Sequence, residues 1–214
     1  MPLLSPIQYS GSRSQKIDDI LTVILEKRQG EKIPCFYELF AGASSLSLNA
    51  IEADIADSYV INDAYWGFAL FWHMVRDAHE QLIAKYQQLG GLYTQTDETS
   101  RHQFYQWIQV KFNEHYLHEK HPSQDLKVLQ AARFAFIINH AHFGEPFFKE
   151  FYPNKSDKKY QFLNCQMTSE LGQLEIDEAF SSRVLAIHQL LQNKNVHFES
   201  KSFFDYIDTV SSKS

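Results

Sequence analysis

Several features that would assign the chain to a class at once are absent from its 214 residues. There are only two cysteines, Cys35 and Cys165, and no Cys-x-x-Cys pair, so neither a disulfide framework nor a zinc site is indicated. The ten histidines are scattered, and we expect no metal. No apolar run reaches the roughly 18 residues of a membrane span, and the first residues do not resemble a signal peptide. We therefore expect a cytoplasmic protein without a membrane partner.

Positive charge is also scarce. Lysine and arginine number 20 against 26 acidic residues, which gives a net charge of −6. Proteins that bind nucleic acid usually carry basic surface, because phosphate contacts dominate their affinity. The stretch 149–159 is the local exception, with four lysines and two acidic residues. A nucleic-acid partner would therefore have to be gripped by a small part of this chain.

The stretch from Ile33 to Asp63 organises the rest of the sequence. An apolar run leads into a turn of small residues around Gly42, a segment with helical spacing follows, and a second apolar run ends in Asn62-Asp63. Strand, glycine turn, helix, strand and acidic residue form half of a nucleotide-binding α/β unit. The turn admits a ligand to the backbone, and a carboxylate at the second strand end can accept ribose hydroxyls. With a single glycine, an ordinary βαβ turn remains an equally good interpretation of this stretch alone.

Apolar periodicity supplies the other elements. We predict three strands, at residues 33–39, 58–62 and 196–199, in a parallel sheet with an exposed edge that would serve for docking. Gly90-Gly91 should end the third helix, and residues 143–160 show no clean period and read as an ordered loop. The predicted helices cover residues 16–29, 45–53, 65–89, 97–112, 126–139, 175–193 and 202–210.

Three stretches together carry a family resemblance. They are PIQYSGSRS at residues 6–14, the stretch from Ile33 to Asp63, and AARFAFIINHAHFG at residues 131–144. In order and spacing they resemble the adenine-specific N6 DNA methyltransferases of the Dam, or D12, class over nearly the whole chain. The family's Asp-Pro-Pro-Tyr motif is absent, although KSFFDYI at 201–207 is similar to the segment that precedes it. We therefore expect a truncated enzyme that ends just before that motif.

The resemblance implies an α/β fold with a Rossmann-like sheet for an S-adenosylmethionine-dependent methyltransferase, incomplete here with about three strands. Residues 1–64 and 194–214 would form the partial core, and residues 65–193 a mainly helical insertion for DNA recognition. Arg13 stands where the family usually has lysine, and Ser44 where it has a second glycine. The implied S-adenosyl-L-methionine contacts are Tyr9, Gly11, Arg13, Glu38, Phe40, Gly42, Ser44, Asp63, Ser202 and Phe203.

Double-stranded DNA is the implied partner, and the segment after the third stretch is the implied contact region. The family's Asn-Gly-Leu-x-Arg is replaced here by Phe143-Gly144-Glu145-Pro146-Phe147, so an arginine is lost. The implied DNA-binding residues are Asn139, His140, His142, Phe143, Lys149, Lys155, Lys158 and Lys159, with a solvated loop face as the alternative for the lysines.

The resemblance thus predicts adenine-N6 methylation of DNA, of a Dam-like or restriction-modification kind, in a bacterial or phage setting. No catalytic residue is assigned, because the motif that would supply it is absent; it would lie on a second polypeptide, or it has been lost through truncation or frameshift. Two other hypotheses stay open. The chain is a non-catalytic remnant or a DNA- or partner-binding subunit of a split methyltransferase, or it methylates a small molecule or a protein.

Overall fold

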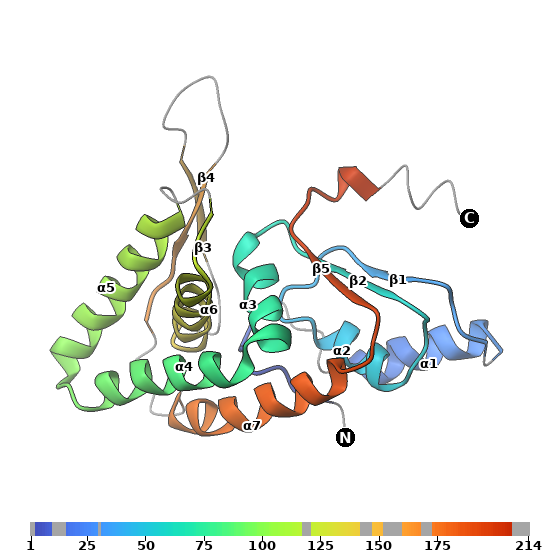
Figure 1. Ribbon diagram of the computed structural model, residues 1–214, viewed down its shortest axis with the longest axis horizontal. Coiled ribbons are helices and arrows are strands. Elements are labelled where there is room, and N and C mark those ends of the chain that lie inside the picture. Colours follow the sequence, from blue (N-terminus) through green and yellow to red (C-terminus); the bar gives the residue numbers. More distant parts are fainter. Residues whose placement is uncertain are drawn as a thin grey trace.

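The computed structural model describes residues 3–9, 16–29, 31–116, 121–141, 147–151, 160–167 and 173–206. Figure 1 shows a small parallel sheet on one side of the molecule and a block of helices with a β-hairpin on the other. This arrangement confirms the expected α/β class, with three parallel strands and helices between the second and the third.

The sheet contains β1 (Phe36–Glu38), β2 (Tyr59–Asn62) and β5 (Val196–Glu199), in the order β1-β2-β5. Tyr59 lies between Phe36 and Val196 in the register, and both pairings are parallel. All three strands therefore end at the same edge of the sheet. In open parallel sheets this carboxyl edge is where ligands bind.

The two faces of the sheet differ. Buried side chains, such as Phe36, Tyr59 and Phe198, point to the helices, while Tyr37 and Val60 on the opposite face are only half-buried. The ring of Trp72 stacks on Phe198 at 6.2 Å between centroids and joins the helices to the sheet. A parallel sheet is usually covered on both faces. Here the described residues cover one face much better than the other.

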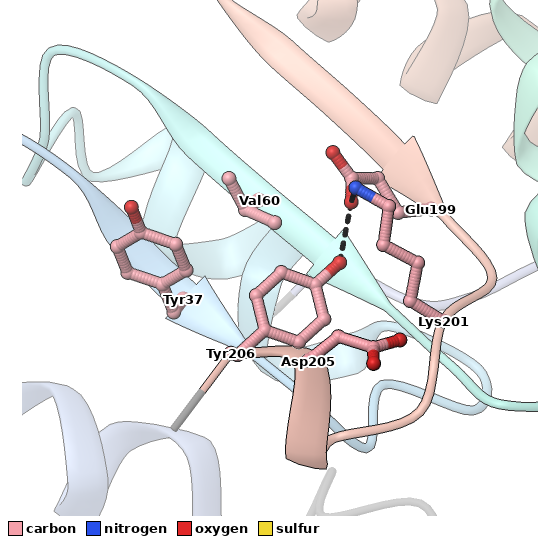
Figure 2. A pocket seen from close by; sticks show the side chains of 6 residues that line it. All are labelled: Tyr37, Val60, Glu199, Lys201, Asp205 and Tyr206. Atoms are coloured by element: carbon pink, nitrogen blue, oxygen red, sulfur yellow. Dashed lines mark hydrogen bonds and ion pairs between the residues drawn. The ribbon is translucent and has the colours of Figure 1, made fainter. Parts of the chain in front are cut away.

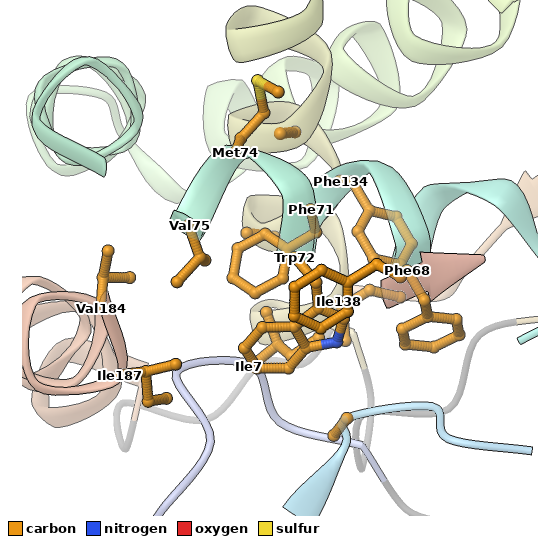
Figure 3. Close-up of a cluster of buried hydrophobic side chains, with 14 of the residues drawn as sticks. Ile7, Phe68, Phe71, Trp72, Met74, Val75, Phe134, Ile138, Val184 and Ile187 are labelled. Carbon is orange, nitrogen blue, oxygen red and sulfur yellow. The ribbon is translucent and has the colours of Figure 1, made fainter. Parts of the chain in front are cut away.

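Helix α1 precedes β1, and α2 connects β1 to β2. Helix α6 (Gln124–Asn139) forms the centre of the helical block (Figure 1). Nearly every residue of α6 from Val128 onward is buried, as expected for a helix that is apolar on all sides. Figure 3 shows Phe134 and Ile138 of α6 packed with side chains of α3 and α7 around Ile7. The helices are α1 (Ile17–Lys27), α2 (Ser45–Glu52), α3 (Trp66–Asp77), α4 (His79–Thr94), α5 (Glu98–Tyr116), α6 and α7 (Gln173–Leu191).

The prediction of one helix over residues 65–89 is wrong in two respects. The chain breaks at Ala78, whose φ of −150° and ψ of 38° separate α3 from α4. The second helix then continues through Gly90-Gly91 to Thr94. A glycine inside a helix costs roughly 1 kcal/mol, and the burial of Leu82, Tyr86 and Leu89 along the same helix outweighs it.

The loop prediction for residues 143–160 is also wrong where the structure describes that stretch. Residues of β3 (Phe147–Phe151) pair antiparallel with β4 (Tyr160–Asn164), from Phe147 opposite Asn164 to Phe151 opposite Tyr160. The stretch had no clean period because charged residues interrupt its aromatic ones. Of the helix predicted at 202–210, the described residues form one helical turn at 204–206. None of the described helices is long and apolar enough to cross a membrane.

Candidate functional site

The turn after β1 is built around a glycine in a left-handed conformation. Gly42 has φ +48°, and its N–H donates a 2.9 Å hydrogen bond to Oδ2 of Asp63 at the end of β2. The ring of Tyr9 covers it so closely that a Cβ at residue 42 would lie 2.6 Å from Tyr9 Cε1. The space above Gly42 is thus filled by a side chain from the N-terminal segment.

Asp63 connects the turn after β1 to the start of α3. Its Oδ2 accepts from Gly42, and its Oδ1 accepts from the backbone N–H of Tyr65 at 2.9 Å, at the start of α3. Burial raises the pKa of Asp63 above its usual range, and the two backbone hydrogen bonds oppose that rise in part. Each carboxylate oxygen has a second lone pair. Asp63 therefore serves the turn and the helix start and still has acceptor capacity for a ligand.

Tyr9 lies against Gly42 and near Asp63, and these three residues form the Tyr9 cluster. Its ring meets Phe68 of α3 edge-on, with centroids 5.3 Å apart. Burial raises the pKa of Tyr9, and the negative charge of Asp63 raises it further. The fold therefore brings Tyr9, Gly42 and Asp63 together from three separate segments.

Asn139 at the end of α6 fixes the segment that carries Tyr9. Its Oδ1 accepts from Gln8 N at 2.7 Å, and its Nδ2 donates to Pro6 O at 3.0 Å and to the Tyr86 hydroxyl at 2.9 Å. Asn139 is fully buried. It binds the backbone of residues 6–8 as a neighbouring strand would, and so it connects the helical block to the sheet edge.

Glu38, the last residue of β1, and Ser44, in the turn that follows, are both buried. Oε2 of Glu38 accepts from the backbone N–H of Ser47 at 3.0 Å and from the Ser47 hydroxyl, which caps the first turn of α2. Ser44 has φ 54°, is fully buried, and its hydroxyl has no hydrogen-bond partner among the described residues. The N–H at Ser47 is therefore used within the protein rather than offered to a ligand.

Asn62 is an organising residue that reasoning from the sequence missed. Asn62 is fully buried at the end of β2. Its Nδ2 donates to Leu39 O at 3.1 Å and to Lys201 O at 3.0 Å, and its Oδ1 accepts from Lys201 N at 2.8 Å. One side chain thus ties together the chain segments that leave all three strands. The only signal in the sequence was its position, directly before the acidic residue at a strand end.

An aromatic group lies at the same edge. Phe40 is 62% exposed, its ring lies 5.5 Å from that of Phe203, and Phe203 lies 4.1 Å from Phe204, which is 68% exposed. Ser202 is exposed beside them, and its carbonyl accepts from Asp205 N. Exposed aromatic rings at a carboxyl edge offer a flat apolar surface to a ligand.

A hollow of about 480 Å³ opens on the less covered face of the sheet, as Figure 2 shows. The Tyr206 hydroxyl bridges Glu199 and Asn62, and Lys201 forms a 2.6 Å ion pair with Glu199. This hollow does not include Gly42 or Asp63, so it is separate from the Tyr9 cluster. Its lining consists of Tyr37, Val60, Glu199, Lys201, Asp205 and Tyr206.

The residues expected to contact DNA fall into three groups: two are buried at the end of α6, one belongs to β3, and the others lie outside the described residues. His140, like Asn139, is fully buried; its Nδ1 lies 2.9 Å from Phe136 O and its ring stacks on Phe136 at 3.9 Å. Neither side chain presents surface to a duplex in this conformation. Lys149 belongs to β3. The other expected site residues, Gly11, Arg13, His142, Phe143, Lys155, Lys158 and Lys159, lie outside the described residues.

Comparison with known proteins adds the family. The model of a family described as D12 class N6 adenine-specific DNA methyltransferase matches residues 9–204. A search of curated proteins found no match. The family uses S-adenosylmethionine as methyl donor for the N6 position of adenine in DNA. The matched range spans most of the sequence and includes the Tyr9, Gly42 and Asp63 cluster. The chain therefore belongs to the D12 class N6 adenine-specific DNA methyltransferase family.

Proposed function

We propose that the carboxyl edge of the β1-β2-β5 sheet binds S-adenosylmethionine and that the chain provides the donor-binding and DNA-facing part of an adenine-N6 methyltransferase. The observation that carries the proposal is the convergence of Tyr9, Gly42 and Asp63 at this edge. When bound, the donor supplies a methyl group on a sulfonium. The protein has to bind it, shield it and present it.

Asp63 is the proposed ribose ligand. Both of its oxygens are oriented by backbone N–H groups at 2.9 Å, and each keeps a lone pair for a hydroxyl. Exposed Phe40 and half-buried Phe203 provide an apolar surface for the adenine of the donor, beside exposed Ser202. Tyr9, rather than the backbone of Gly42, would contact the donor, because its ring covers that glycine.

The remaining donor contacts are proposed from the resemblance. Gly11 would allow the chain to approach the donor's carboxylate, and the guanidinium of Arg13 would bind it as a fork. Glu38 and Ser44 would act from the interior by fixing the turn, because both are buried.

The hairpin side of the molecule is the proposed target-recognition region. Residues 65–193 would contain it, with Lys149, Lys155, Lys158, Lys159, His142 and Phe143 as the proposed DNA contacts. Asn139 and His140 would support this region from inside, since neither has exposed surface. Base flipping is required in such a reaction, because the amino group of adenine is paired within the duplex.

The groups that act on the adenine amino hydrogens are proposed to come from a segment outside these 214 residues. The sequence contains no Asp-Pro-Pro or Asn-Pro-Pro. Such a segment would either continue the same polypeptide or belong to a second one. The incompletely covered face of the sheet, with its hollow of about 480 Å³, leaves room for it.

The test measures N6-methyladenine in duplex DNA by mass spectrometry after incubation with S-adenosylmethionine. We expect methylation when a polypeptide carrying the Asp-Pro-Pro-Tyr segment is supplied, and none with the chain alone. Asp63→Asn should reduce it strongly at donor concentrations that do not saturate the variant. Absence of methylation with every such segment, from a chain that melts cooperatively, would contradict the proposal.

A second candidate is a non-catalytic subunit that binds DNA or a partner. The open sheet face and exposed Phe204 favour it, because both offer surface to another chain. It differs from the first proposal in one measurable respect: it predicts DNA or protein binding without binding of the methyl donor.

A further inference from the structure

The hairpin is attached to the helical block through two side-chain amides of α5. Gln109 donates from Nε2 to Cys165 O at 3.1 Å and accepts at Oε1 from Cys165 N at 2.7 Å. Asn113 does the same for Leu163, with Nδ2 donating to its carbonyl at 2.9 Å and Oδ1 accepting from its N–H at 3.0 Å. Each amide therefore satisfies both polar groups of one backbone residue.

The geometry of the two elements explains why this pairing works. Residues four apart on a helix are separated by about 6 Å along the axis, at roughly 1.5 Å per residue. Alternate residues of a strand are separated by about 6.6 Å, at roughly 3.3 Å per residue. Gln109 and Asn113 therefore match Cys165 and Leu163 in spacing, and α5 takes the place of a neighbouring strand along this edge.

The attachment is largely excluded from water. Leu163, Cys165 and Gln109 are 1%, 6% and 9% exposed. A buried backbone group that loses its partner costs more than the net gain of an ordinary hydrogen bond. A backbone bridge between Ala141, just after α6, and Met167 continues the attachment. The base of the hairpin is thus held at a defined orientation against α5.

We propose that Gln109 and Asn113 are positioning residues that orient the β3–β4 hairpin for target recognition. The inference rests on the proposed function, in which this side of the molecule faces DNA. Neither residue would touch the methyl donor, because both act on β4 and the residue after it. Loss of either amide should therefore weaken DNA recognition and leave donor binding unchanged.

The decisive variants are Asn113→Asp and Gln109→Glu. Each keeps an oxygen that accepts from the backbone N–H and replaces the donating NH₂ by an oxygen that repels the facing carbonyl. Gln106→Glu is the matched control, because Gln106 is exposed on the same helix and bonds only to the His102 ring among the described contacts. Asn113→Ala, which adds no charge, replaces Asn113→Asp if that variant does not fold.

Two measurements distinguish the attachment of the hairpin to α5 from the proposed role of that attachment in DNA recognition. Hydrogen–deuterium exchange of residues 160–167 should become about 10-fold faster in the variants, while exchange in α6 stays at the level of the unmodified protein. Affinity for a mixed-sequence fluorescent duplex should fall about 10-fold below that of Gln106→Glu, with unchanged affinity for S-adenosylmethionine.

Unchanged exchange in residues 160–167 would overturn the attachment itself. Faster exchange with DNA affinity equal to the control would overturn the positioning role. If the unmodified protein bound no duplex, the proposed DNA partner and the positioning role would both fail, and the exchange result would still show whether Gln109 and Asn113 hold the hairpin.

Discussion

The sheet edge and the hairpin base are held in different ways. At the sheet edge, Asp63 and Asn62 tie the ends of strands to one another, so the same groups that build the turn also form the proposed donor site. At the hairpin base, two amides of α5 hold β4, and the proposed DNA contacts lie elsewhere. Substitutions at the sheet edge should therefore change both the stability of the protein and its affinity for the methyl donor. Substitutions at the hairpin base should weaken DNA recognition and leave the affinity for the methyl donor unchanged.

Asn139 connects the two regions. Its amide holds the backbone of residues 6–8, which carries Tyr9 to the sheet edge, and Ala141 only two residues later forms the bridge to Met167. A substitution at Asn139 should therefore affect both the sheet edge and the base of the hairpin.

Asn139→Ala should have the largest effect. The variant loses three hydrogen bonds and leaves Pro6 O and the Tyr86 hydroxyl without this partner, so we expect unfolding to become easier by about 3 kcal/mol. Donor affinity should fall as well, because Tyr9 is no longer held. Urea denaturation measures the first and calorimetry the second. Asn195→Ala, at an exposed residue, is the control, and equal stability of the two variants would contradict this account.

Gly42→Ala should affect the sheet edge alone. The left-handed φ of +48° disfavours alanine, and the new methyl would displace the Tyr9 ring, for a combined loss of about 2 kcal/mol of stability. Hairpin exchange should not change. Gly91→Ala is the matched control: it adds a methyl in a helix with no atom within 4 Å and should stabilise the protein by about 0.5–1 kcal/mol. Similar shifts of Tm in the two variants would count against the role of Gly42.

Asp63→Asn should change how the stability and the donor affinity of the protein depend on pH. The folded-state pKa of Asp63 is raised by burial, so its contribution to stability is complete below the unfolded value near 3.9 and is lost as pH rises through the folded pKa. Donor affinity should change in the opposite direction, because the ionised form is the better acceptor. We expect Asp63→Asn to remove both trends and to weaken donor binding by about 30-fold at neutral pH. Parallel pH profiles of variant and unmodified protein would argue against this assignment.

Ser44→Gly should have the smallest effect, and a favourable one. It relieves the left-handed strain and removes a buried hydroxyl that lacks a partner, against the greater chain entropy of glycine, for a net gain of about 1 kcal/mol. Thermal melting checks it, with Ser181→Gly in the middle of α7 as a control that should lose stability. A loss of stability in Ser44→Gly would show that the hydroxyl is satisfied in solution.

Some of this arrangement was predictable from the sequence. The apolar runs that end in Glu38 and Asp63 predicted parallel strands, and parallel strands bring their ends together. The proximity of Gly42 and Asp63 therefore followed from local signals, but the hydrogen bond between them was not predicted. Tyr9 joined them only through the family resemblance, since nothing local predicts that residues 6–8 meet α6.

The parts that were missed depend on contacts between distant segments. Gly90-Gly91 lies inside α4 because buried neighbours outweigh its poor helix propensity. Asn139 is buried and binds the backbone of Pro6 and Gln8, whereas the sequence suggested an exposed DNA contact. Its role depends on how the N-terminal segment packs against α6, which no local pattern predicts. The hairpin was not predicted because side-chain amides of α5 bind the backbone N–H and C=O groups along one of its edges. Such hydrogen bonds leave no pattern in the sequence of the strand itself.

The central claim is that the sheet edge is a methyl-donor site with Asp63 at its centre. Calorimetric titration of the purified chain with S-adenosylmethionine tests it most directly, beside Asp63→Ala and the matched control Asp57→Ala, whose exposed side chain lies two residues before β2. We predict binding in the micromolar range for the unmodified chain and for Asp57→Ala, and none for Asp63→Ala. Absence of binding to the folded chain, or equal affinity of all three proteins, would contradict the claim.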